Sequence, residues 1–327
     1  MMTVPRPAAT RPRAVLSVLL CALALAAIAA QDAEPGRAAA GALVVRTPTK
    51  GLYLDLAPAG SRCVAVGVHG LIVRSDDAGA TWTQSPAPVD RMLTCISFSD
   101  ARSGWAAGHD GVILATTDAG ATWTRPSTPA TVDDSFLDIL ALPDGRLYAV
   151  GAYGLFLASA DRGATWERRP ALDEDLHLNR ITAGPSGTLY LAAEAGALAT
   201  STDQGATWTR IETPYEGSFF GFGELASGRL LAHGLRGHVY VSDDDGATWT
   251  QSRIEHSGLI ATSLELPGGL LGVAGAGGEV FFSRDGGLTF TDGRPTGLTA
   301  VAEMIAAGAS LIFAGDSGLV ALPSPQP

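Results

Sequence analysis

The chain has 327 residues, of which 40 are glycine and only 17% are charged, and its formal net charge is −11 at pH 7. Such an acidic chain, which has no stripe of Lys and Arg, is not expected to bind nucleic acid or to adhere to an anionic membrane. The many glycines, and the absence of helical apolar periodicity after the N-terminal segment, favour an all-β fold of short strands joined by tight turns.

Residues 1–30 have the pattern of a secretory signal peptide. Residues 14–30 are apolar and end in small side chains around Ala29, and the segment before them is basic, with Arg6, Arg11 and Arg13. This pattern predicts an exported protein of the periplasm or another extracytoplasmic space, with a linker at residues 31–41. An uncleaved anchor is the alternative, because about 17 apolar residues are at the lower limit for spanning a membrane. We expect membrane contact only through such a leader or through a partner.

The rest of the chain is organised by one eight-residue phrase that occurs six times. Its pattern is Ser/Thr-x-Asp-x-Gly-x-Thr followed by an aromatic residue, and successive aromatic positions are 41 to 43 residues apart. A repeat of about forty residues is typical of a four-stranded blade of a β-propeller. The aspartates are Asp77, Asp118, Asp161, Asp203, Asp244 and Asp285, and the aromatic residues are Trp82, Trp123, Trp166, Trp208, Trp249 and Phe290.

Each phrase is predicted to form a tight turn between two strands. The Asp carboxylate can accept hydrogen bonds from backbone N–H groups two residues on, and the Gly two positions later can adopt a positive φ at little steric cost. The aromatic residue then opens the next strand as a large apolar anchor. We therefore interpret the six aspartates as structural rather than catalytic residues.

The number of blades follows from a second repeated turn. Gly-rich turns between second and third strands occur seven times, so the sequence predicts seven blades over residues 42–323 and a short tail at 324–327. The last unit stops after its third strand, residues 319–322, whereas residues 42–48 form a strand without a hairpin partner. We expect these two segments to pair and close the ring, because an open blade would expose a hydrogen-bonding edge.

The phrase resembles the Asp-box, or BNR repeat, of sialidase-like propellers, in which the box is a structural turn away from the ligand face. Residues 105–114, which lead into the box at 116–123, make the chain similar to the photosystem II stability/assembly factor family, particularly its non-photosynthetic bacterial relatives. The resemblance implies an exported, non-catalytic propeller that binds a protein and assists a membrane complex or transporter. No cofactor is expected, and the six histidines lack the spacing of a metal site.

A partner would meet the face formed by the loops between blades and the turns between second and third strands. These segments combine carboxylates, a few cations and aromatic side chains, which are frequent anchors of protein contacts. Of the adjacent Phe219 and Phe220, one is expected to face outward, with core packing as the alternative. The candidate partner-binding residues are Asp133, Asp134, Tyr153, Asp173, Glu174, Asp175, His177, Arg180, Tyr215, Phe219, Phe220 and Arg236.

A glycoside hydrolase or glycan-binding protein is the alternative function, because Asp-box propellers include sialidases and xyloglucan hydrolases. Such hydrolases usually need two carboxylates on either side of the scissile bond. The residues that could supply this pair are Asp55, Asp133, Asp134, Asp173, Asp175 and Glu216.

The sequence after the leader contains two cysteines, Cys63 and Cys95. Export would permit a disulfide between them, but spacing alone does not show whether their Cα atoms lie close enough. Two buried thiols in strands are the alternative.

If the leader is removed on export, the mature protein should begin at or near Ala30. Mass spectrometry of the N-terminus, on protein purified from its native cells, measures the start directly. An intact Met1 recovered in the membrane fraction would favour the anchor instead.

Overall fold

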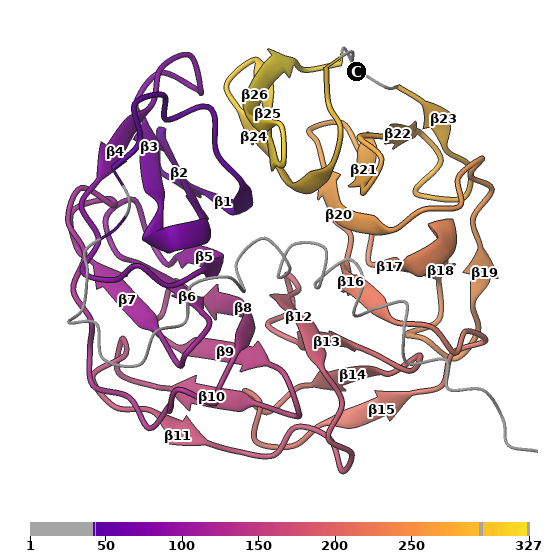
Figure 1. Cartoon of the computed structure of the whole chain (residues 1–327). Helices are drawn as coiled ribbons and strands as arrows, with labels where there is room; N and C mark the ends of the chain where they lie inside the picture. The colour runs from indigo at the N-terminus through magenta and orange to yellow at the C-terminus, as the bar shows by residue number, and fades with distance from the viewer. Residues whose placement is uncertain (1–41, 43, 294–296, 326–327) are drawn as a thin grey trace, which may run out of the picture. The chain divides into compact units, whose positions relative to one another are not determined.

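Seven antiparallel β-sheets are arranged around a common axis, and each sheet is formed by one consecutive stretch of the chain (Figure 1). The computed structural model describes residue 42, residues 44–293 and residues 297–325. The predicted leader at 1–30 and linker at 31–41 lie outside the described residues. The arrangement confirms the predicted seven-bladed β-propeller.

Within each blade the strands are hydrogen-bonded in chain order, and the first strands of neighbouring blades contact one another around the axis. The four-stranded blades are blade 1 (β1 Tyr53–Ala59, β2 Arg62–Gly67, β3 Ile72–Ser75, β4 Thr83–Ser85), blade 3 (β8 Phe136–Ala141, β9 Leu147–Gly151, β10 Phe156–Ser159, β11 Glu167–Arg168), blade 4 (β12 Leu178–Ala183, β13 Leu189–Ala193, β14 Leu198–Ser201, β15 Thr209–Ile211), blade 5 (β16 Phe219–Glu224, β17 Leu230–Gly234, β18 Val239–Ser242, β19 Thr250–Gln251) and blade 6 (β20 Ile260–Glu265, β21 Leu271–Gly275, β22 Val280–Ser283, β23 Thr291–Asp292).

Two blades have three strands, namely blade 2 (β5 Leu93–Phe98, β6 Gly104–Gly108, β7 Ile113–Thr116) and blade 7 (β24 Val301–Ala307, β25 Ser310–Gly315, β26 Gly318–Pro323). In blade 2, an isolated bridge between Ala115 and Thr124 stands where the fourth strand would be. Two short 3-10 turns, η2 (Val68–Gly70) and η3 (Leu235–Gly237), are the helical elements of the described residues, and neither is long and apolar enough to span a membrane.

Each Asp-box is held by the same hydrogen bonds. In the first box the Asp77 carboxylate accepts the Thr81 N–H at 2.8 Å, the Thr81 hydroxyl at 2.6 Å and the Ser75 hydroxyl at 2.8 Å, while Ser75 Oγ accepts the Gly79 N–H. The carboxylate thus reaches the residue four positions on, and the predicted bond two residues on is wrong, because the serine hydroxyl occupies that N–H. The predicted positive φ is confirmed, at 87° for Gly79, and Ala78 before it has φ 55°.

The aromatic residue of each box packs between its own blade and the preceding one. Trp123 of blade 2, for example, lies in a cluster with Val64 of blade 1 and Ile96 of its own blade, and Phe290 of blade 6 packs with Val241 of blade 5. The apolar core is therefore a ring of clusters between neighbouring blades, which the box aromatics complete from the outside.

The expected pairing of residues 42–48 with 319–322 is wrong for the described residues. Blade 7 is a three-stranded sheet, and residues 44–48 form no strand; Ala42 and Val45 donate instead to the Ala87 carbonyl and the Gln84 side chain of blade 1. The chain bends in a turn at 47–50 that contains Pro48, instead of running beside β26 as a strand. At the seam, the Leu319 N–H donates to the Thr49 carbonyl, and side chains of β1, β2, β24 and β25 share one apolar cluster.

Both cysteines of the described chain are buried and free, Cys63 in β2 and Cys95 in β5. Of the two alternatives that the sequence left open, the structure thus supports buried strand thiols. Burial raises the pKa of the Cys63 thiol to about 11 and raises that of Cys95, so neither is activated as a thiolate.

Replacing a box aromatic should destabilise the whole ring, because it empties an interface between two blades. For Trp123→Ala, with a side chain 6% exposed, we expect the free energy of unfolding to fall by about 3–5 kcal/mol. Tyr153→Ala is the matched control, since Tyr153 is 74% exposed, and its loss should cost roughly 0.5 kcal/mol or less. Chemical unfolding followed by circular dichroism compares the two; equal losses would contradict the packing role.

Candidate functional site

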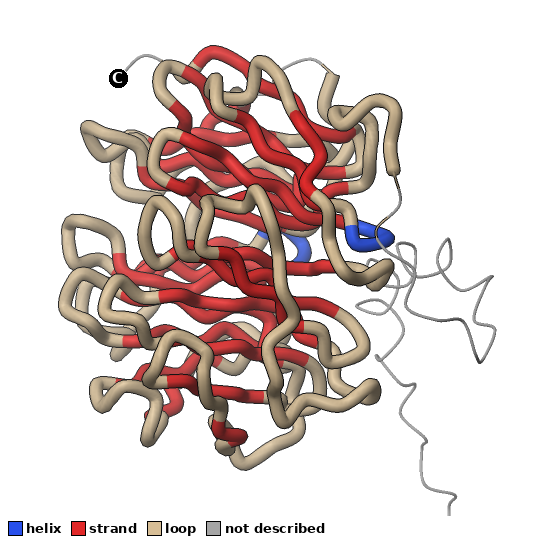
Figure 2. The backbone as a smooth tube through the Cα atoms, turned by 90° about the vertical axis from the view of Figure 1, so that its left-hand side faces the viewer, coloured by secondary structure: helices blue, strands red, loops and turns tan. Residues whose placement is uncertain are grey.

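The strands run between two layers of loops, one at each end of the ring (Figure 2). At one end, which we call the loop face, the turns between second and third strands contact the loops between blades, as where Gly154 N–H donates to the Leu176 carbonyl. The η2 and η3 turns belong to this end. At the other end, the box face, Asp-boxes contact the turns between first and second strands, as where Arg162 N–H donates to the Gly145 carbonyl.

Tyr153, His177 and Glu194 form a cluster on the loop face between blades 3 and 4. The rings of Tyr153 and His177 meet edge to face at 4.8 Å between centroids, and His177 Nδ1 lies 3.3 Å from the Glu194 carboxylate. The same carboxylate accepts the backbone N–H of His177 at 2.9 Å. The glutamate therefore holds the backbone of His177, whereas the buried ring nitrogen Nδ1 has no hydrogen-bond partner within the described residues. The histidine ring lies against a tyrosine that is largely exposed to solvent.

Tyr215 and Arg236 lie on the loop face between blades 4 and 5. The Tyr215 ring stacks on His238 with centroids 4.5 Å apart, and its hydroxyl donates to the Leu235 carbonyl at 3.1 Å. Arg236, at the tip of η3 with φ 58°, is exposed beside them. The pair thus places an aromatic ring from the loop between blades 4 and 5 near a cation on the η3 turn of blade 5.

The acidic rim residues differ in how they are paired. Asp134 forms an ion pair with Arg168 of β11 at 2.6 Å, and Glu174 forms one with Arg210 of β15 at 2.7 Å. The remaining acids of the predicted set are exposed: Asp133, Asp173 and Asp175. The exposed negative charge of this sector is thus smaller than the sequence suggests.

Three of the predicted rim residues lie away from the loop face surface. Phe219 is fully buried between blades 4 and 5, so of the two adjacent phenylalanines it is the one in the core. Phe220 is half-buried and lines a cavity among the inner strands, the name we give to the first strand of each blade. Arg180 points into the central channel, where it forms an ion pair that the sequence did not predict.

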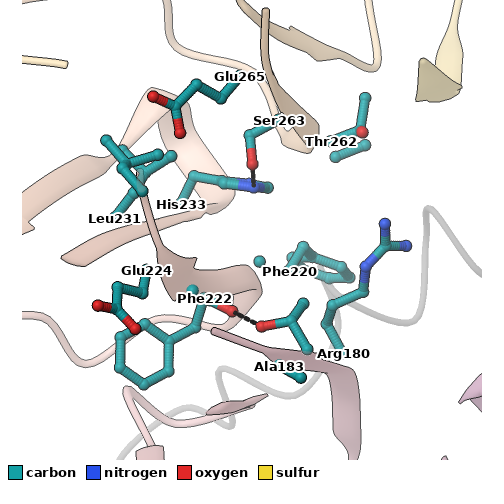
Figure 3. A pocket seen from close by; sticks show the side chains of 15 residues that line it. Arg180, Ala183, Phe220, Phe222, Glu224, Leu231, His233, Thr262, Ser263 and Glu265 are labelled. Carbon is teal, nitrogen blue, oxygen red and sulfur yellow. Dashed lines mark hydrogen bonds between the residues drawn. The ribbon is translucent and has the colours of Figure 1, made fainter. Parts of the chain in front are cut away.

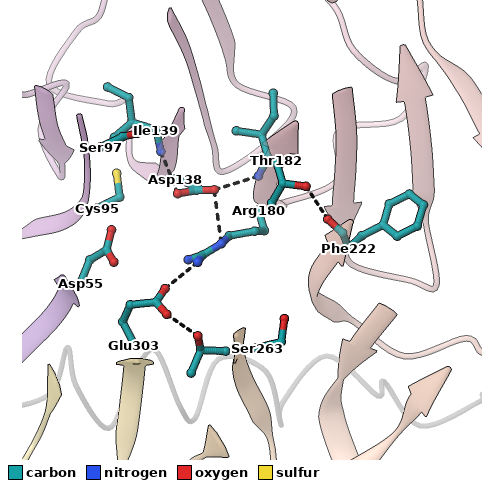
Figure 4. Close-up of polar contacts among 12 residues, drawn as sticks. Asp55, Cys95, Ser97, Asp138, Ile139, Arg180, Thr182, Phe222, Ser263 and Glu303 are labelled. Carbon is teal, nitrogen blue, oxygen red and sulfur yellow. Dashed lines mark hydrogen bonds and ion pairs between the residues drawn. The ribbon is translucent and has the colours of Figure 1, made fainter. Parts of the chain in front are cut away.

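The channel contains a network of four charged side chains from blades 1, 3, 4 and 7 (Figure 4). The Arg180 guanidinium contacts the Glu303 carboxylate at 2.5 Å and lies 3.7 Å from that of Asp138. The second Glu303 oxygen accepts the Thr262 hydroxyl and the Met304 N–H. Blades 4 and 7, on opposite sides of the channel, are thereby linked by a buried ion pair.

Asp55 and Asp138 each join two neighbouring inner strands. Asp55 accepts the N–H of Leu56 on its own strand and of Ile96 on the next, both at 2.7 Å. Asp138 likewise accepts the N–H of Ile139 at 2.9 Å and of Ile181, one blade on, at 2.8 Å. These carboxylates satisfy the hydrogen bonding of backbone N–H groups at the channel. Asp55, one of the candidate catalytic acids, is one of the two carboxylates that accept these bonds.

The buried carboxylates have perturbed pKa values. Burial raises the pKa of Asp138 to about 6, and burial together with the Glu303 charge raises the pKa of Asp55 well above its usual range. The Glu303 carboxylate raises the pKa of Arg180, which therefore stays charged. In the boxes the effect is opposite, because hydrogen bonds from Thr81 and Thr207 lower the pKa of Asp77 and Asp203 to about 2.

The fold and the repeated turn define an Asp-box β-propeller. The sequence model of the family described as photosynthesis system II assembly factor YCF48 matches residues 43–129. The chain is thus an Asp-box propeller that resembles this photosystem II assembly factor family. No curated protein sequence matches the chain.

Several solved structures share the fold. YCF48 bound to D1 peptide superposes with a TM-score of 0.72 at 20% identity, over 90% of this chain and 99% of that chain. YCF48 from Cyanidioschyzon merolae gives 0.69 at 16% identity, over 88% and 99% of the two chains. AFV00434, an ancestral GH74 enzyme, gives 0.70 at 14% identity over 86% of this chain, but this corresponds to only 46% of the enzyme chain.

The two kinds of carboxylate should change stability in opposite directions as the pH falls. Asp138 and Asp55 bind protons more tightly in the folded chain than the ordinary pKa of about 3.9 allows, so their contribution to stability should rise as the pH falls from 7 to about 5. The buried His233 of β17, whose pKa burial lowers to about 4, acts against them over the same range. The box aspartates have folded pKa values below 3.9, so their contribution should be lost as the pH falls from about 4 towards 2.

Urea unfolding midpoints between pH 2.5 and 8, at constant ionic strength, measure this profile. Asp138→Asn removes one titrating group, so its stability relative to the unaltered protein should increase between pH 5 and 7, while the acid limb stays unchanged. A stability difference between the two proteins that is constant from pH 5 to pH 7 would contradict the assignment.

Proposed function

We propose that this protein is a non-catalytic, exported propeller that binds a protein partner on its loop face and serves the assembly of a membrane complex or transporter. The observation that carries the proposal is the Tyr153–His177–Glu194 cluster, which presents an exposed aromatic ring packed edge to face on the histidine. Exposed aromatic residues are common anchors of protein interfaces, and a pre-ordered anchor loses little conformational entropy on binding.

The comparisons support a protein rather than a small molecule as the partner. The family model that matches residues 43–129 is that of an assembly factor, and a structure with the same fold is described as bound to a peptide. At 20% identity that likeness concerns the fold, so the nature of the partner of this chain is part of our proposal.

The loop face offers charge as well as aromatic surface. Three exposed carboxylates lie in the loops on either side of blade 3: Asp133 between blades 2 and 3, and Asp173 and Asp175 between blades 3 and 4. Arg236, on the η3 turn of blade 5, supplies a cation. Charges of this kind steer an approaching partner and select its register more than they hold it. A partner segment with a basic stretch beside an apolar or aromatic residue would fit this surface.

Glycoside hydrolysis is the second candidate, because a propeller of a GH74 enzyme shares the fold. Against it, the box aspartates are occupied by turn hydrogen bonds, Asp55 is bound to two backbone N–H groups, and Asp134 and Glu174 are paired with arginines. Of the six candidate acids, Asp55 and Asp134 are thus occupied, while the other four are exposed and form no ion pair within the described residues: Asp133, Asp173, Asp175 and Glu216.

Reversing charges on the loop face should weaken partner capture while leaving the fold intact. We expect Asp173→Lys, Glu174→Lys and Asp175→Lys together, or Tyr153→Ala alone, to lower recovery of the partner from the native cell envelope by about tenfold or more. The charge variant should also change the salt dependence of capture. Quantitative mass spectrometry of affinity-purified material measures both effects.

A variant with the same change in net charge on the box face, Asp76→Lys, Asp243→Lys and Asp245→Lys, is the control and should capture the partner normally. Position 245 tolerates a long basic side chain, since the equivalent box position holds Arg162 at nearly the same φ. If instead the purified protein hydrolyses a sialoside or xyloglucan, and replacing one rim carboxylate by Ala stops it, the proposed binding function is wrong.

A further inference from the structure

A shared irregularity allows the seven inner strands to be compared position by position. In each of them the register shifts between the first and third residues, and the third residue lies at the channel. In blade order, the residues at this channel position are Asp55, Cys95, Asp138, Arg180, Gly221, Thr262 and Glu303.

Blade 5 departs from the other blades at this position. It has Gly221 there, and the His233 ring from β17 fills the space, since a Cβ at 221 would lie 2.0 Å from its Nε2. His233 is 2% exposed. In the other blades the residue paired with the channel position is small or branched and apolar: Val66, Ala107, Val150, Ala192, Ala274 and Ala314.

The next position of the inner strands breaks a second pattern, in blade 6. Ser263 of β20 follows the channel residue of blade 6, where the other blades have large apolar side chains: Leu56, Ile96, Ile139, Ile181, Phe222 and Met304. Gly223 of β16 lies close to Thr182, whose Oγ1 would be 3.1 Å from a Cβ at this position. Breaks in an otherwise consistent pattern are expected where a site, rather than the fold, selects the residues.

The three departing residues Gly221, His233 and Ser263 line, together with Gly223, one cavity of about 200 Å³ among β12, β16 and β20 (Figure 3). At about 30 Å³ for each heavy atom, as for water, it has room for roughly six atoms, the size of one long side chain. Glu224 and Glu265, the last residues of β16 and β20, line the end towards the box face. This cavity is therefore separate from the proposed partner surface on the loop face.

The cavity offers hydrogen-bond acceptors. His233 Nδ1 lies 3.0 Å from the Ile260 carbonyl, which can only accept, so Nδ1 carries the proton and Nε2 accepts the Ser263 hydroxyl at 3.1 Å. Burial lowers the pKa of His233 to about 4, in keeping with a neutral ring. The lone pairs of Ser263 Oγ remain available to a donor in the cavity.

The two glutamates add negative charge without a matching cation. Glu224 accepts the Tyr190 hydroxyl at 3.1 Å, and Glu265 accepts the Ala226 N–H at 2.8 Å. Within the described residues, neither carboxylate forms an ion pair with Lys or Arg, and Arg180, the cation in the cavity wall, is bound to Glu303. Half-buried carboxylates without a cationic partner favour a positively charged ligand.

We propose that this cavity binds a cation carried on a short alkyl chain, that is, the ammonium or guanidinium group of a basic side chain or of a free amine. The charged end would lie between Glu224 and Glu265, and one of its N–H groups would donate to Ser263 Oγ. The alkyl part would pack against the half-buried ring of Phe220 and the surface left bare by Gly223.

Chemical-shift titration of the purified protein, read at the amides of Gly221 and Gly223, tests the proposal. The probes are N-acetyl-lysine methylamide, N-acetyl-arginine methylamide and butylammonium, with N-acetyl-norleucine methylamide as the neutral control of similar size. We expect saturable shifts with the cationic probes and none with norleucine. Binding of the capped amino acids at least as tight as that of butylammonium indicates a polypeptide ligand, and binding of butylammonium alone indicates a free amine; both outcomes support the cation site.

Variants of the protein test whether the cavity recognises the charge of the probe or only its size. Glu224→Gln with Glu265→Gln should weaken binding of the lysine probe by about tenfold or more, and Ser263→Leu, which restores the residue type of the other blades, should abolish it. Glu212→Gln with Glu255→Gln removes the same charge from exposed positions elsewhere and should leave affinity unchanged. Equal binding of norleucine and lysine probes, no shift with any probe, or no effect of the Glu224 and Glu265 replacements would overturn the proposal.

Discussion

The fold depends on a carboxylate that closes a turn of five residues. In every box the aspartate binds both the N–H and the hydroxyl of the threonine four positions on, and this fixes where the aromatic residue leaves the turn. The aromatic side chain then enters the interface with the preceding blade. Local hydrogen bonding thereby sets a long-range contact, and the repetition of one short phrase is enough to space the blades around the ring.

This coupling explains why the architecture was predictable and why other features were not. The phrase encodes its turn locally, so the length of a blade and the anchoring role of residues such as Trp123 follow from its spacing, and the blade number follows from the seven Gly-rich turns. The seam does not, because residues 42–48 have the apolar pattern of a strand, and only the turn at 47–50 and the side chain of Gln84 decide where they lie. Short apolar runs carry no information about which edge they join.

At the candidate site, too, local sequence patterns did not show where every residue lies. Sequence reasoning placed Arg180 on the rim because it follows an acidic loop, but the bulge at the start of β12 turns it into the channel. The signal that was missed is positional: Asp55, Asp138 and Glu303 are charged residues inside apolar strands, at equivalent places in their repeats. Comparing the repeats with one another, rather than with a general pattern, would have separated channel residues from rim residues and would have singled out Gly221 and His233.

The closure of the ring by side chains has a consequence for its motion. Apolar clusters join neighbouring blades all round the ring, and each blade from 1 to 6 also continues into the next through the chain itself. Blades 7 and 1 are joined, among the described residues, by their apolar cluster and the backbone bond from Leu319 to Thr49. Apolar packing tolerates small sliding displacements that a hydrogen-bonded ladder does not. The contact between blades 7 and 1 should therefore be where opening motions of the ring are largest. Amide hydrogen exchange should be fastest there among the inner strands.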